Sequence, residues 1–211
     1  MTQEELRRFI RTLADDRNKE SPLVSDSELN MFIREAEREA FERSSLGRLD
    51  STYNIRIVQS KSTYEIDELI IFIERAKLSG QSIPLLKTTK KELDFNVPGW
   101  ELQPEGIPRF YFQNDLIITL YPKPNADFTL ILDGCRYPEV SMETPSHLHE
   151  SLAYWALYRF YSIHDIDTED MRRAMENRDK FDKVFGHKKP QTFVRDWKNG
   201  SAHSPLYITG F

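Results

Sequence analysis

Cysteine is almost absent from this sequence, and its scarcity limits how the protein can be held together. The 211 residues include one cysteine, Cys135, which excludes an internal disulfide framework and fits a reducing compartment. Apolar runs of the roughly 18 residues needed for a membrane span are also missing, and the charged start MTQEELRRF is not a signal peptide. We therefore expect a protein made in the cytosol without a membrane anchor.

Basic residues are not in excess either. The chain holds 29 Lys and Arg against 34 Asp and Glu, a net charge of −5, whereas a general nucleic-acid binder normally has a basic surplus. Hydrophobic residues make up 39% of the chain and aromatic residues 12%, which is ordinary for one or two packed domains.

Motifs for catalysis are missing as well: the chain has no Walker loop, dinucleotide fingerprint or G-x-S-x-G elbow. His147 and His149 would point about 200° apart on a helix and cannot share a metal ion. Asp165, Asp167 and Glu169 resemble a calcium loop without its glycine and terminal glutamate, so a helix start is the better interpretation. We predict no catalytic residue, no metal and no cofactor.

The first 47 residues predict a pair of amphipathic helices. Thr2 with Glu5 and Ser25 with Glu28 have the spacing of capping boxes. Apolar residues then recur at helical spacing, which predicts helices over 3–17 and from 25 to between Ser44 and Gly47. The short connection between them is typical of an antiparallel helix hairpin.

From Tyr53 the apolar period shortens towards two, which predicts strands. The expected strands are 52–58, 63–67, 68–78, 107–113, 116–122 and 128–138. Short turns join the last three, so we expect a meander of antiparallel neighbours. A short helix capped by Thr89 is predicted over 88–95, and Cys135 is expected to be a buried small hydrophobe in the last strand.

Two further helices follow the strands. Thr144 is expected to cap, and Pro145 to open, a helix that reaches residue 163. The broad apolar face of this helix indicates burial on more than one side. The last helix, 169–185, is expected to end at Gly186.

Residues 187–211 show no period and predict an extended arm. Lys188, Lys189, Arg195 and Lys198 against Asp196 give this segment a net charge of +3. It is rich in aromatic residues for a disordered tail, so we expect it to order against a partner. The candidate partner-binding residues are Phe193, Arg195, Trp197, Tyr207 and Phe211.

The predicted fold class is α+β. We expect a helical bundle of two N-terminal and two C-terminal helices, with an inserted antiparallel β-sheet or sandwich and the C-terminal arm. The expected divisions are 1–47 for the first helix pair, 48–143 for the β-region, 144–186 for the second helix pair and 187–211 for the arm.

Several segments, in this order, resemble the head-to-tail adaptor (connector) proteins of tailed bacteriophages, in the branch with a β-rich insertion between helix pairs. The resemblance covers roughly residues 25–187. It rests on SELNMFIREAEREAF, KELDFNVPGW, GIPRFYF, LIITLYPKP, LILDGCRYP, PSHLHESLAYWALYRFYSIHDIDTED and FDKVFG.

This resemblance implies a structural virion protein without enzymatic activity. The subunits would form a ring, usually twelve-fold, beneath the portal of the DNA-filled capsid, and the other face of the ring would receive a tail or neck protein. DNA would pass through the lumen without sequence-specific binding. Helices 145–163 and 169–185 are our candidates for the two different patches that a closed ring requires.

Two alternatives remain open. Trp100, Tyr111 and Tyr121 would suit a sugar platform, so a carbohydrate-binding or glycan-hydrolysing accessory protein is the second candidate. A DNA-binding helix-turn-helix in the first helix pair is the third, and the evenly mixed charges of residues 25–43 speak against it.

Overall fold

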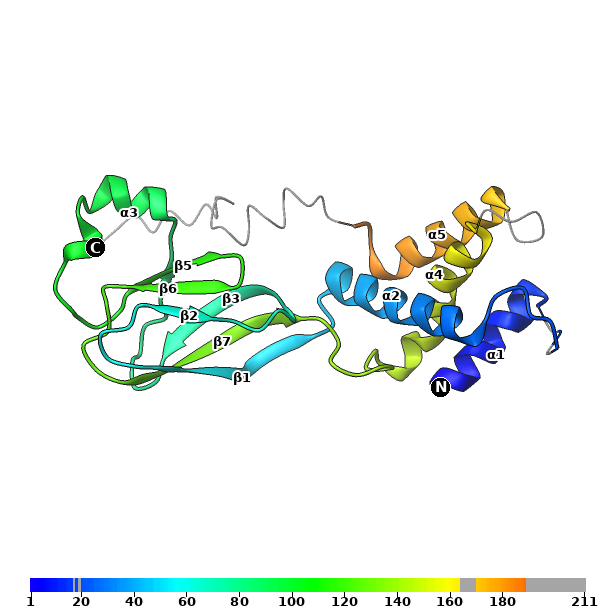
Figure 1. Cartoon of the computed structure of the whole chain (residues 1–211), viewed down its shortest axis with the longest axis horizontal. Coiled ribbons are helices and arrows are strands. Elements are labelled where there is room, and N and C mark those ends of the chain that lie inside the picture. Colours follow the sequence, from blue (N-terminus) through cyan, green and yellow to red (C-terminus); the bar gives the residue numbers. More distant parts are fainter. Residues whose placement is uncertain (17, 19, 164–169, 189–211) are drawn as a thin grey trace. The chain divides into compact units, whose positions relative to one another are not determined.

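The computed structural model describes residues 1–16, 18, 20–163 and 170–188. These residues form two compact units: Met1–Gly47 with Arg136–Lys188, and Arg48–Cys135. The strands are inserted between the N-terminal and the C-terminal helices, so the predicted α+β class is confirmed (Figure 1).

The first unit is a helical bundle. Its elements are α1 (Gln3–Ala14), α2 (Asp26–Ser44), η2 (Ser146–Leu148), α4 (His149–Tyr161) and α5 (Met171–Phe185). Both predicted capping boxes are present, at Thr2 and at Ser25. Helix α1 ends three residues before its predicted limit because Asp15 adopts a left-handed backbone conformation, with φ of 59°.

Thr144 does not cap a helix, so that prediction was wrong. The Thr144 hydroxyl donates a hydrogen bond to the Glu37 carboxylate of α2 at 3.1 Å. The same carboxylate accepts the backbone N–H groups of Met142 and Thr144 at 2.8 and 3.1 Å. A buried tertiary partner therefore takes the hydroxyl that a cap would use, and α4 begins only at His149, after the turn η2.

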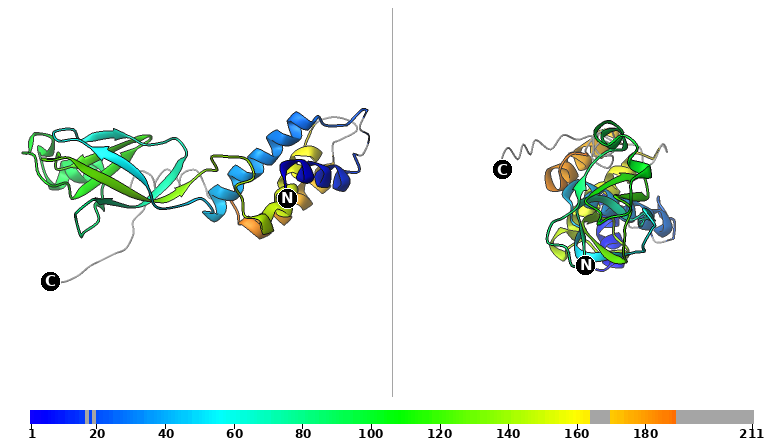
Figure 2. Two further views of the ribbon diagram at one scale, coloured as in Figure 1. Left: turned by 90° about the horizontal axis from the view of Figure 1, so that it is seen from below. Right: turned by 90° about the vertical axis from the view of Figure 1, so that its left-hand side faces the viewer.

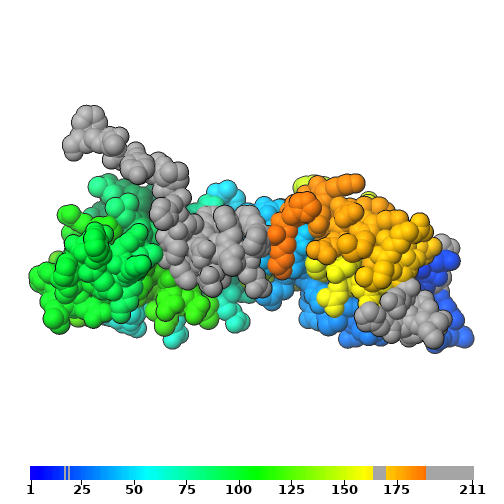
Figure 3. All heavy atoms as spheres, turned by 90° about the horizontal axis from the view of Figure 1, so that it is seen from above, coloured from blue at the N-terminus to red at the C-terminus, as the bar shows by residue number. Residues whose placement is uncertain are grey.

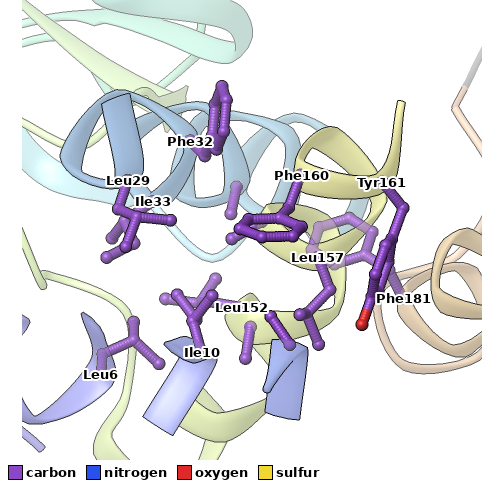
Figure 4. Packing of buried hydrophobic residues seen from close by; sticks show 14 of the residues in the cluster. Leu6, Ile10, Leu29, Phe32, Ile33, Leu152, Leu157, Phe160, Tyr161 and Phe181 are labelled. Carbon is purple, nitrogen blue, oxygen red and sulfur yellow. The ribbon is translucent and has the colours of Figure 1, made fainter. Parts of the chain in front are cut away.

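Helix α4 lies at the centre of the first unit and contacts α1, α2 and α5 (Figures 2 and 4). Its broad apolar face is buried on several sides, as predicted. The buried side chains of α4 are His149, Leu152, Ala153, Ala156, Leu157, Phe160 and Tyr161. They pack against Leu6 and Ile10 of α1, Leu29 and Ile33 of α2, and Phe181 of α5.

The second unit contains two sheets with strand orders β1-β7-β3 and β2-β6-β5-β4. Its strands are β1 (Arg48–Ile57), β2 (Thr63–Glu65), β3 (Ile70–Leu78), β4 (Leu86–Lys87), β5 (Phe110–Asn114), β6 (Ile117–Tyr121) and β7 (Phe128–Arg136). Side chains from both sheets form one core that includes Ile73, Tyr111, Ile118, Leu120, Leu130 and Leu132.

The predicted three-stranded meander is only half present. Strands β5 and β6 are antiparallel neighbours, but β7 pairs with β1 and β3 in the other sheet. The connection from β6 to β7 is held against the turn after β1: Ser60 N–H donates to the Pro124 carbonyl at 2.8 Å, and Gln59 N–H donates to Asp127 at 2.9 Å. The expectation of antiparallel neighbours was therefore wrong for β6 and β7.

Between β4 and β5 the chain forms α3 (Lys90–Asn96) and η1 (Trp100–Leu102). The predicted cap is confirmed, because the Thr89 hydroxyl accepts the Glu92 N–H and the Glu92 carboxylate accepts the Thr89 N–H. Cys135 is buried in β7, as expected.

Candidate interaction surfaces

The C-terminal end of α2 is tied to the end of α5 by a buried arginine. The Arg43 side chain is 2% exposed and forms ion pairs with Glu39 at 2.9 Å and with Asp182 at 2.5 Å. It also donates a hydrogen bond to the Gly186 carbonyl at 3.1 Å. The cation lies 5.1 Å from the ring centroids of Trp155 and Phe181. These contacts hold α2, α4 and α5 together where the last helix ends.

Lys188, the last described residue of this unit, is held at the same place. Its ammonium lies 2.6 Å from Glu39 and 3.6 Å from Glu42. Burial acts to lower the pKa of Lys188, but the hydrogen bond and charge of Glu39, with the charge of Glu42, outweigh burial and raise that pKa. The segment from residue 189 onward therefore starts from an anchored point on α2.

Both connections to the second unit start from this same end of the helical unit. Gly47 follows α2, and its carbonyl accepts the Arg136 N–H at 2.8 Å. Tyr137 donates to Glu42 at 3.5 Å, and Arg38 lies 4.5 Å from the Tyr137 ring centroid. One end of the bundle thus carries both connections to the second unit and Lys188, the last described residue after α5.

The outer face of α5 is exposed (Figure 3), and its side chains are chemically mixed. Met171 and Met175 are 52% and 45% exposed, and Arg172 between them is also exposed. Further along, Arg178 and Lys180 lie 5.8 and 5.6 Å from the ring centroids of two α4 tyrosines. Helix α5 therefore exposes three apolar side chains, Met171, Met175 and Val184, within a mainly basic surface.

The two predicted ring-contact helices differ in what they expose. Helix α4 uses its apolar face inside the unit, so the expectation that this face is available to another subunit was wrong. Helix α5 buries Ala174, Asn177, Phe181 and Phe185, and the described residues leave most of its other side chains exposed. The five candidate arm residues, Phe193, Arg195, Trp197, Tyr207 and Phe211, lie outside the described residues.

The two histidines point apart, as predicted. His147 is exposed, whereas His149 is buried, with Nε2 2.6 Å from the Thr144 carbonyl oxygen and Nδ1 3.0 Å from the Met1 nitrogen. Within the described part of the chain, no three His, Cys, Asp or Glu side chains are placed to hold a metal ion. No helix in that part is long and apolar enough to span a membrane.

The three aromatic residues considered as a sugar platform do not share a surface. Tyr111 is 2% exposed in the core of the second unit, where burial raises the pKa of its hydroxyl. Trp100 stands edge-on to Tyr121 with ring centroids 5.7 Å apart, and its indole N–H donates to Asp94 at 2.8 Å. The arrangement is a packed aromatic cluster, not a row of flat exposed rings.

The family model of the SU10 adaptor protein matches residues 1–204 of this chain. The chain belongs to the SU10 adaptor protein family. No curated protein matches the sequence. The family match extends the resemblance noted for residues 25–187 over both ends and includes α1 and much of the arm. The SU10 adaptors are bacteriophage head-to-tail adaptors, so this protein is a structural component of a phage virion.

Proposed function

We propose that this SU10 adaptor assembles into a closed, twelve-fold ring beneath the portal, in the neck of the virion. The ring joins the DNA-filled capsid to a downstream tail or neck protein, and its subunits are made in the host cytoplasm. The observation that carries the proposal is the family match over residues 1–204. The match includes the first unit, which we call the helical unit, the second unit (Arg48–Cys135), which we call the β-unit, and most of the arm.

A closed ring requires two different patches on each subunit. The outer face of α5 supports one of them, because Met171 and Met175 supply an apolar centre and Arg172 and Arg178 a charged surround. An apolar centre with a polar rim is the usual anatomy of a protein interface. The described fold leaves this face of α5 uncovered, whereas the apolar face of α4 is buried in the core of the helical unit.

The lumen of the ring passes DNA without sequence-specific binding. A strongly basic wall would hold phosphate groups and slow the passage of DNA. The net charge of −5 supports a channel that is neutral or acidic. The subunit has no catalytic task in this role.

The arm binds the portal or a neighbouring subunit. Phe193, Trp197, Tyr207 and Phe211 supply apolar anchors, and Arg195 supplies a charge for the rim of the contact. The anchored position of Lys188 supports this role, because it gives the arm a defined starting point on α2.

Native mass spectrometry with the cognate portal tests the proposal. We expect a portal-bound complex that contains one full ring of the chain, whether or not the chain alone is a monomer. A chain that stays monomeric in the presence of intact portal would contradict the proposed function.

A further inference from the structure

The most exposed apolar side chains of the described structure are concentrated in one stretch of the β-unit. Among the described residues, five large apolar side chains are at least 60% exposed, and four of these five lie between residues 83 and 102 of the β-unit. They are Ile83 (75%), Leu86 (60%), Phe95 (85%) and Leu102 (91%). Single exposed apolar residues are normal, but a concentration of them marks an interaction site.

Two of these residues border a cavity beside β4. The cavity has a volume of about 470 Å³. Its lining includes the polar residues Gln81, Ser82 and Arg109 and seven apolar residues: Ile83, Pro84, Leu85, Leu86, Ile107, Pro108 and Phe110. An apolar cavity of roughly 150 Å³ already accepts a benzene ring, so this one has room for large aromatic side chains. We call these seven apolar residues the β4 surface.

The segment that carries the exposed Phe95 and Leu102 is joined to β5 and β6 by contacts of neighbouring residues. The Phe110 ring that lines the cavity lies 6.2 Å from Tyr121, which contacts Trp100 at 5.7 Å. Trp100 also packs against Phe112 at 5.8 Å. Lys90 pairs with Glu101 at 3.2 Å, which links α3 to η1. Because the segment is preorganised, a partner that binds it orders little additional chain.

The chain itself contains a segment with matching chemistry. Residues 189–211 hold four aromatic residues and a net charge of +2, against −2 for residues 48–135, which carry ten Lys and Arg and twelve Asp and Glu. Twenty-three extended residues span up to about 75 Å, which is enough to reach another subunit. This segment begins from Lys188, which is anchored on α2.

We propose that the β4 surface receives aromatic side chains of segment 189–211 from a neighbouring copy of the chain. This inference rests on the proposed ring, because such a contact joins two different patches of identical subunits in head-to-tail fashion. Burying one large apolar side chain contributes roughly 1.5–3 kcal/mol, so two or three anchors suffice for a specific contact.

Photo-crosslinking from the arm in the full-length chain tests this contact. Trp197 is replaced by p-benzoylphenylalanine in an unlabelled copy, which is mixed with ¹⁵N-labelled chain and assembled on the portal. We expect crosslinks to residues 81–86 or 107–110, joining unlabelled to labelled peptides. Crosslinks within one copy, to the portal only, or to other parts of the subunit would overturn the inference, as would the absence of any crosslink.

A matched pair of variants shows whether the β4 surface itself is responsible. Leu86→Glu places a charge in the lining of the cavity, and we expect at least a fivefold loss of crosslink yield. Val58→Glu changes an exposed apolar residue of the same unit that does not line the cavity, and its yield should be unchanged. Equal yields would overturn the inference, and circular dichroism melting checks that both variants are folded.

Native mass spectrometry of the same samples separates this inference from the proposed function. A ring on the portal whose arm crosslinks elsewhere would overturn the arm contact alone. Failure of the ring to form on the portal would overturn the proposed function and, with it, the inference that rests on it.

Discussion

A single buried cation, Arg43, links three helices of the bundle. Its partners are two carboxylates, a carbonyl group and two aromatic rings, so the cost of removing the guanidinium from water is offset on all sides. Removing the guanidinium is costly, because the partly buried carboxylates of Glu39 and Asp182 lose a cationic partner.

Replacing Arg43 by methionine should lower the free energy of unfolding by about 3 kcal/mol, because Asp182 and Glu39 lose their buried partner. Urea unfolding followed by circular dichroism measures the change. Arg34→Met, at an exposed position of the same helix, should stay within about 0.5 kcal/mol of the wild type. Similar values for the two variants would show that the Arg43 contacts contribute little.

The pair Arg136 and Glu143 predicts a dependence of stability on pH. The Arg136 hydrogen bond, with the Glu139 N–H, holds the pKa of Glu143 below its ordinary value of 4.5, although burial opposes this. A carboxyl group whose pKa is lower in the folded state stabilises the protein above pH 4.5, and the stabilisation is lost as the pH falls through the folded-state value.

Glu143→Gln should therefore reduce the stability difference between pH 6 and pH 3, as measured by urea unfolding at a series of pH values. The wild type and the variant should differ most near pH 6 and converge at pH 3. If the two curves stay parallel over this range, Glu143 does not titrate as described.

At the scale of elements, the approach of β7 to β3 depends on a glycine. A Cβ atom at Gly134 would lie 2.2 Å from the Phe72 carbonyl oxygen and 3.1 Å from the Ile73 Cα. Both are backbone atoms of β3, so a side chain at this position would have to push the strands apart. The central strand of the three-stranded sheet therefore tolerates no Cβ here.

Gly134→Ala should destabilise the protein by about 1–3 kcal/mol, measured as a shift in the thermal unfolding of the β-unit. Asn54→Ala, at an exposed position of β1 in the same sheet, should change stability by no more than about 0.5 kcal/mol. A Gly134→Ala protein with wild-type stability would contradict the close packing of β7 on β3.

Elements set by local sequence were predictable, and those set by distant partners were not. Capping boxes at Thr2, Ser25 and Thr89 involve residues three apart, so their helices followed from the sequence. Thr144 has the same local signal, but Glu37, 107 residues away, takes its hydroxyl group. The pairing of β7 with β1 likewise depends on tertiary contacts.

The candidate interaction surfaces also divide into those that local sequence predicts and those that depend on residues far apart in the chain. The mixed exposed surface of α5 could be predicted from its helical period. The Arg43 cluster could not, because Asp182 is 139 residues away and Arg43 resembles any surface arginine of a charged helix. The β4 surface was missed because Ile83, Leu86 and Ile107 are too far apart in sequence to form a periodic pattern.

At the scale of the whole molecule, we expect the arm to be needed for assembly but not for folding. Deleting residues 190–211 should leave the circular dichroism spectrum and melting temperature of the two units unchanged, because each described unit has its own core. Binding to the portal or to neighbouring subunits should be impaired, as measured by mass photometry of mixtures. Loss of folding on truncation would show instead that the arm belongs to a core.

Reconstruction of the virion neck by cryo-electron microscopy, with symmetry determined from the data, tests the central claim most directly. We predict a ring of subunits directly beneath the portal, into which the helical unit and the β-unit fit as separate bodies. A neck whose density accommodates neither unit, or a virion that contains the chain only at another location, would contradict the assignment of this protein as a ring-forming head-to-tail adaptor.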